Sequence, residues 1–172
     1  MSRFGVWVAV VLVALAAVGS AGAAGKERVV VDHFVEPYAF AVSCAPYGPY
    51  TFDNLVSGRE HVRVTEVLAK DGALLQLVLD IQFQETNVNS ETGKELTLKG
   101  AVHEVWDFTS NTRTISGKVF LGTGEGGGTW VQDTGRITMT LDTKEPRFVG
   151  GPHEAFFGGG IDVLACAALA SS

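Results

Sequence analysis

The apolar and polar residues of the chain alternate over two long segments, residues 73–85 and 95–108, which a polar stretch separates. In the first segment every second residue is a large aliphatic or aromatic one, and the residues between are mostly glutamine and aspartate. Such alternation places one set of side chains on one face of a β-strand and the other set on the opposite face. The two segments therefore predict a long antiparallel hairpin with one apolar face.

The second segment of this hairpin contains one exception, Glu104, which falls among the apolar positions Val102 and Trp106. A carboxylate on an apolar face is costly unless it is paired, and unusual acids inside cavities are candidates for function. A β-bulge near Gly100 or Ala101 would instead turn Glu104 to water. The sequence favours this bulge or a position at the rim of the fold, and it leaves Glu104 as a weak candidate for a catalytic group.

Shorter alternating segments fill much of the remaining chain, and none has the spacing of an amphipathic helix. Short connections between successive strands favour antiparallel neighbours. We therefore expect an all-β fold, an antiparallel up-and-down barrel of about eight strands or, alternatively, a two-sheet β-sandwich. Besides the hairpin, the expected strands cover residues 29–34, 59–68, 113–121, 129–132, 135–142 and 161–169.

The first residues of the chain have the pattern of a secretory signal peptide. Arg3 precedes an apolar run over residues 4–18, and the small residues at 21–23 match a cleavage site. Residues 1–23 are therefore expected to be a leader and residues 24–172 a single domain. The alternative is an uncleaved leader that anchors the protein, because the apolar run approaches the roughly 20 residues that span a bilayer.

The chain of 172 residues has a formal net charge of −6, and its basic residues are scattered along the sequence. Non-specific binding of nucleic acid needs lysine and arginine clustered on one surface. The composition therefore argues against a nucleic-acid partner and is typical of a soluble exported protein. We expect a secreted location, with membrane contact only through the leader during export.

Cys44 and Cys166 are the two cysteines of the chain, and they lie near the two ends of the predicted domain. An even number of cysteines in an exported protein indicates a disulfide. Neither cysteine has a histidine or a basic residue beside it in the sequence that would activate a thiolate. A disulfide between them is therefore preferred over a nucleophilic or metal-binding cysteine.

Each histidine of the chain stands next to an acidic residue, which raises the question of a metal site. Adjacent residues on a strand point to opposite faces, so these pairs cannot converge on one ion. The glycine-rich loop 122–128 continues as strand, whereas phosphate-binding loops lead into a helix. We therefore predict no metal and no cofactor. The histidines are His33, His61, His103 and His153.

The residues of the apolar face either fill a core or line a cavity. Both are consistent with an eight-stranded barrel, which is wide enough for its own side chains or for one small ligand. If a cavity forms, the residues expected to line it are Leu77, Leu79, Ile81, Phe83, Val102, Glu104, Trp106, Ile137 and Met139.

Short motifs of the chain resemble those of a group of small exported bacterial proteins of unknown function. They are the early Cys44, the turn and strand at residues 91–100, the strand entry at 133–136 and the tail at 162–169. These motifs are structural in character, so the resemblance implies an exported domain and carries no activity. At the level of fold the strand pattern is also similar to the barrels of lipocalins and of the allene oxide cyclase and dirigent group, and fold alone does not imply function.

These features together favour a non-enzymatic binding or interaction module, whose partner is a small apolar ligand or an extracellular protein. The alternative hypothesis is a cyclase-like or isomerase-like enzyme that uses Glu104 inside the barrel. The sequence contains neither Gly-x-Ser-x-Gly nor His-Glu-x-x-His, so the best-known hydrolase motifs are absent.

Overall fold

The structure is a computed structural model, and it describes residues 26–124, 127–153, 155 and 160–171. The predicted leader, residues 1–23, lies outside the described residues. Among the residues that are described, no helix is both long and apolar enough to cross a membrane.

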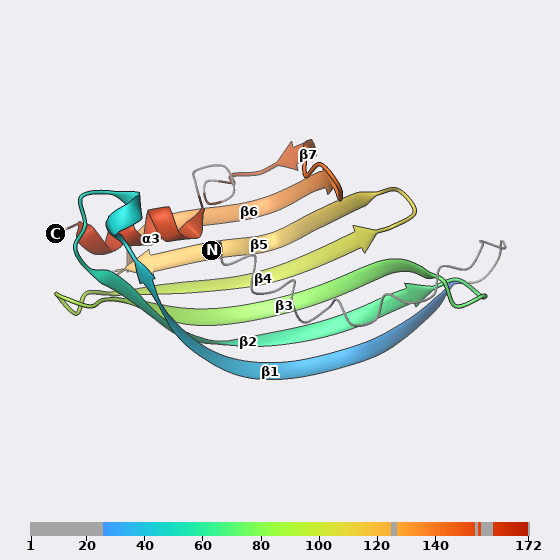
Figure 1. The fold of residues 1–172 in the computed structure, drawn as a ribbon, viewed down its shortest axis with the longest axis horizontal. Coiled ribbons are helices and arrows are strands. Elements are labelled where there is room, and N and C mark those ends of the chain that lie inside the picture. The colour runs from blue at the N-terminus through green and yellow to red at the C-terminus, as the bar shows by residue number, and fades with distance from the viewer. Residues whose placement is uncertain (1–25, 125–126, 154, 156–159, 172) are drawn as a thin grey trace.

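Seven strands form one antiparallel sheet, in which each strand pairs with its neighbours in the sequence (Figure 1). The predicted all-β antiparallel class is confirmed, as is the hairpin, whose two strands pair from Gln76 with Asp107 to Val88 with Glu95. The strands are β1 (Glu27–Ser43), β2 (Asp53–Leu68), β3 (Leu74–Asn89), β4 (Glu95–Asp107), β5 (Thr112–Gly124), β6 (Thr129–Thr140) and β7 (Pro146–Gly150).

The predicted closure into a barrel of about eight strands is wrong. β1 and β7 lie at opposite edges of the sheet and pair with β2 and β6 alone, so the sheet is open. A barrel needs a last strand that is long enough to meet the first one. β7 has only five residues against 17 in β1, and the apolar segment that follows it forms a helix.

That helix, α3 (Ile161–Ala170), corrects the prediction of a strand at residues 161–169. The segment is apolar almost throughout, and periodicity cannot distinguish a buried strand from a buried helix in such a run. Its alanines decide the outcome, because alanine has the highest helix propensity. The buried residues of α3 recur at helical spacing and pack against the sheet; they are Ile161, Asp162, Ala165, Cys166 and Leu169.

The predicted disulfide between Cys44 and Cys166 is present and fastens α3 to the end of β1, where the short 3₁₀ helix η1 (Ala45–Tyr47) begins. The two Cα atoms are 5.6 Å apart, and 122 positions separate the cysteines in the sequence. Closing a loop of this length stabilises the folded chain by about 4–5 kcal/mol in the chain-entropy model. Lys94, in the turn between β3 and β4, adds a second anchor, since its Nζ donates to the carbonyl of Ala168 at 2.9 Å near the end of α3.

The strand register sorts the side chains of the sheet onto two faces. We call the face against which α3 packs the inner face, and the opposite one the outer face. One cross-strand row of the inner face consists of Val64, Leu79, Glu104, Ile115 and Ile137. The adjacent row of the outer face consists of Arg63, Asp80, His103, Ser116 and Arg136. The core therefore lies on the inner face, and charged and hydroxyl groups lie on the outer face.

Candidate functional site

Glu104 lies on the inner face, between Leu79 of β3 and Ile115 of β5, and only 5% of it is exposed. The expectation that a bulge turns it to water is wrong. A register shift does lie between Lys99 and Ala101, but it affects the pairing of β4 with β5. The pairing of β4 with β3 is unbroken, so Glu104 keeps the orientation that simple alternation gives it.

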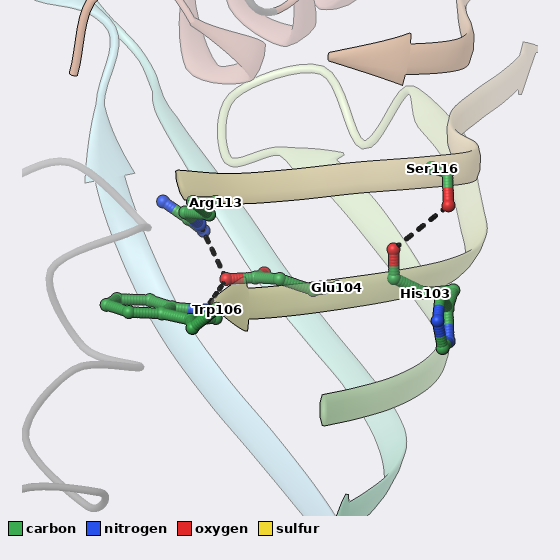
Figure 2. Close-up of polar contacts among 5 residues, drawn as sticks. All are labelled: His103, Glu104, Trp106, Arg113 and Ser116. Carbon is green, nitrogen blue, oxygen red and sulfur yellow. Dashed lines mark hydrogen bonds and ion pairs between the residues drawn. The ribbon is translucent and has the colours of Figure 1, made fainter. Parts of the chain in front are cut away.

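Two side chains hold the Glu104 carboxylate, and one of them, Arg113, also neutralises its charge (Figure 2). Arg113 Nε donates to Glu104 Oε1 at 2.6 Å, and the indole Nε1 of Trp106 donates to the same oxygen. The guanidinium carbon of Arg113 also lies 4.9 Å from the centroid of the Trp106 ring, within the range of a cation–π contact. The buried acid is therefore held within a group of three side chains that contact one another.

Arg113 is the residue that sequence reasoning missed. It faces Trp106 across the β4–β5 turn, and Trp106 is two residues from Glu104 on the same face. A turn of known length fixes which residues of two strands face each other. The polar turn between β4 and β5 could therefore have predicted that this arginine lies on the same face as Glu104. A carboxylate that already accepts from a guanidinium and an indole is poorly placed to remove a proton from a substrate. The geometry therefore gives little support to an enzyme built on Glu104.

The residues predicted to line a cavity all lie on the inner face, where they belong to packed clusters. Ile137 and Met139 pack with Ile115 and Val119, and Leu77 packs with Val62 and Val64. These residues are buried against one another, and Glu104 is buried as well. The remaining residues of the predicted set are half-buried. Their role as a ligand-binding surface stays a prediction.

The inner face also contains Glu60, an acid that forms no ion pair with any described residue; it is 8% exposed and pairs across the strands with Glu36. Burial, and then the facing carboxylate of Glu36, raise the pKa of Glu60 to about 7. Within the described part of the chain its Oε2 has no hydrogen-bond partner. Glu60 is therefore an internal acid whose charge the fold does not compensate.

The histidines fall into two environments. His153 Nδ1 lies 2.7 Å from Asp133 Oδ1, and both side chains are 1% exposed. His103 Nδ1 lies 2.7 Å from Asp80 Oδ1 on the outer face, and both side chains are about half exposed. His33 and His61 are exposed on the outer face as well. Over the described residues no three side chains of histidine, cysteine, aspartate or glutamate approach closely enough to hold a metal ion.

Asp80, His103 and Ser116 follow one another across β3, β4 and β5 in the order of a hydrolytic triad. A triad needs the serine hydroxyl within hydrogen-bond reach of the imidazole. Here Ser116 Oγ donates to the backbone carbonyl of His103 at 3.2 Å, and the His103 ring points away from Ser116 (Figure 2). A small hollow of about 260 Å³ opens beside the three residues. The structure therefore brings the residue types together without the contact that activates a nucleophile.

A larger hollow of about 880 Å³ crosses β1 to β5 on the outer face, and we call it the outer groove. The register brings together basic residues that the sequence scatters. Arg59 pairs across the strands with Gln84, which pairs with Lys99. In the next row, two neutral residues stand between His61 of β2 and Lys118 of β5 across the strands. Three cations and a histidine therefore line one hollow of a chain whose net charge is negative.

Among the described residues, no carboxylate on the outer face forms an ion pair with a cation of the outer groove. Glu85 contributes to its lining, but the Glu85 side chain accepts from Tyr38 OH at 2.9 Å and from Asn87 Nδ2 at 3.0 Å on the inner side of the sheet. Within the described part of the chain, Lys99 and Lys118 form no ion pair, and neither does Arg59. The outer groove is therefore a locally positive surface.

Comparisons with family models, with curated proteins and with solved structures find no match to this chain.

Proposed function

We propose that this protein is a non-enzymatic binding module that takes an anionic ligand into the outer groove. One observation carries the proposal: Arg59, Lys99 and Lys118 line the same hollow, and none of them has an acidic partner in the described structure. These three cations are exposed and form no ion pair with an acid of the protein. An external anion can therefore bind them at little desolvation cost.

The other functions considered have less support. A cyclase or isomerase would use Glu104, whose carboxylate Arg113 and Trp106 already hold. A serine hydrolase would use Ser116 and His103, whose side chains do not meet. An apolar ligand would need the inner face, where Ile137 and other predicted lining residues are packed in the core.

We also propose that the module is exported. The disulfide between Cys44 and Cys166 supports this location, because disulfides form and persist in oxidising compartments. The predicted leader supports it independently of the structure.

The test is the binding of a small, highly charged anion, the fluorescent dye pyrenetetrasulfonate, measured by anisotropy at pH 7 and low salt. The double variant Lys99→Gln/Lys118→Gln should weaken binding about fivefold to thirtyfold, since each exposed charge contact contributes about 0.5–1 kcal/mol. The matched control is Lys144→Gln/Arg147→Gln, which removes two positive charges near β7, outside the outer groove. Equal affinity of the two double variants would show that the outer groove is not the site.

A further inference from the structure

The positive surface extends beyond the outer groove. In the adjacent row of the outer face, Arg63 on β2 and Arg136 on β6 stand at either side of the pair Asp80–His103. Both arginines are exposed. Together with Lys99 on β4 and Lys118 on β5, they distribute positive charge from β2 to β6, across five strands of the sheet.

The length of this surface indicates the size of the ligand. Neighbouring strands lie about 4.8 Å apart, so five strands span roughly 19 Å. A single small anion cannot reach from Arg63 to Arg136 over that distance. The arrangement therefore fits a chain molecule that carries repeated negative charges and runs across the strands.

Neutral hydrogen-bonding groups stand between the cations. Gln82 and Gln84 are exposed at the centre of the outer groove, and Ser57 and Thr86 lie in the row beside them. Amides and hydroxyls both donate and accept, which suits a ligand with many hydroxyl groups.

The aromatic residues of the outer groove face away from it. Tyr38 points its hydroxyl to Glu85 on the inner side, and the Phe83 ring occupies the space beside Gly100, 5.9 Å from the Phe120 ring. Proteins that bind single-stranded nucleic acids stack successive bases on several exposed aromatic rings, and the residues that line the hollow offer none. One exposed ring, Phe148 of β7, does lie beside Arg136 at the far edge of the outer face, and a single ring does not form a row of stacking platforms. The surface therefore favours a polymer of acidic sugars over a nucleic acid.

We propose that the outer face binds an extended acidic polysaccharide, which lies across β2 to β6 with its carboxylates or sulfates on Arg59, Lys99 and Lys118. Arg63 and Arg136 extend this contact to neighbouring sugar units. The inference rests on the proposed function and adds to it the class of ligand.

The test compares four probes by biolayer interferometry on the full mature chain: polygalacturonate, the galacturonate disaccharide, neutral dextran and poly(dT). We expect polygalacturonate to bind at least about tenfold more tightly than the disaccharide, because several contacts on one chain act together. Added salt should weaken this binding, and dextran should not bind.

The variant Arg63→Gln/Arg136→Gln should lose about tenfold in affinity for polygalacturonate and keep its affinity for the disaccharide. The control Lys144→Gln/Arg147→Gln should retain the affinity of the parent protein for both. Unchanged urea midpoints would show that the exposed substitutions leave the fold intact.

Three outcomes would overturn the inference. If disaccharide and polymer bind equally, the site takes a small anion, and the proposed function stands without the polysaccharide. If poly(dT) binds more tightly than polygalacturonate, the ligand is a nucleic acid. If none of the probes binds and the dye does not bind either, both the inference and the proposed function are wrong.

Discussion

The two histidine–aspartate pairs of this protein have the same geometry and opposite surroundings. In each pair Nδ1 lies 2.7 Å from a carboxylate oxygen, yet the side chains of His153 and Asp133 are 1% exposed whereas those of His103 and Asp80 are 52% and 53% exposed. The buried pair joins the segment after β7 to β6, and its second ring nitrogen lies 3.1 Å from the carbonyl of Gly150. The exposed pair stands beside a hollow of the outer face.

The distance between the two groups therefore does not by itself assign a role to such a pair. Both nitrogens of His153 lie within hydrogen-bond reach of oxygen atoms, one of Asp133 and one of the Gly150 carbonyl, so this buried pair ties two segments together and supports the fold. The second nitrogen of His103 is on an exposed ring, where water or a ligand can reach it. A pair that stabilises and a pair that is available for binding therefore differ in burial, not in bond length.

The largest loss of folding stability is expected from Asp133→Ala. This substitution leaves the His153 ring buried without its acidic partner, and breaking a buried pair in this way costs about 3–5 kcal/mol. The measurement is the urea midpoint, with the slope of the transition as a check that unfolding stays two-state.

A cost of less than about 1 kcal/mol for Asp133→Ala, the range of an exposed ion pair, would contradict this assignment. The buried pair would then be no more structural than the exposed one.

A second prediction concerns Glu104 and Arg113, whose side chains are 7% and 20% exposed and so lie close to the buried extreme. Arg113→Met should destabilise the protein by about 2–3 kcal/mol, because it leaves the Glu104 carboxylate in the core without its cation. The double variant Arg113→Met/Glu104→Gln should recover most of that loss, since the uncompensated charge is gone.

The two variants and Glu104→Gln form a double-mutant cycle in urea. A double variant as unstable as Arg113→Met would mean that lost packing against Trp106, and not charge, causes the effect.

The inner face was the predictable half of the molecule. The alternation in β3 and β4 sets which residues pair, and a slip of one residue would expose the entire apolar set, so the hairpin register follows from the pattern. The same pattern placed Glu104 among apolar residues, but the possible bulge at Gly100 obscured its orientation. Arg113 was within reach of the same reasoning, once the turn between β4 and β5 is used to set the register.

The outer groove was not predictable in the same way. Arg59, Lys99 and Lys118 are far apart in the sequence, and their meeting depends on three strand registers and on the shift between Lys99 and Ala101. The helix α3 was missed for a different reason, since an apolar run without polar positions has no readable period. Without a strand in that place, closure of the sheet also failed.

Glu60 is a third buried acid, and it forms no ion pair with any described residue. Its pKa of about 7 lies above the ordinary value of 4.5, so the unfolded chain ionises first as the pH rises. The folded state therefore loses stability progressively between about pH 4.5 and pH 7, and the loss is complete above that. Partial solvent screening reduces the effect to about 1–2 kcal/mol.

Glu60→Gln should therefore leave stability nearly unchanged at pH 4.5 and raise it by about 1–2 kcal/mol at pH 8, relative to the parent protein. The measurement is the free energy of unfolding in urea at the two pH values. Glu36→Gln serves as the control, because removing the facing carboxylate should reproduce part of the gain. An equal effect of Glu60→Gln at both pH values would show that the carboxyl group is not ionising inside the fold.

The smallest effect is expected from Asp80→Asn, which breaks the exposed pair. Exposed ion pairs contribute about 0–1 kcal/mol, because water solvates both partners and salt screens them, so the urea midpoint should hardly move. The binding affinity, unlike the stability, should change measurably. Removing the one carboxylate in the outer row between Arg63 and Arg136 makes that surface more positive, so the affinity for polygalacturonate should rise, and the gain should vanish at high salt. A fall in that affinity would mean that Asp80 serves binding by orienting the His103 ring, and the exposed pair would then be part of the site itself.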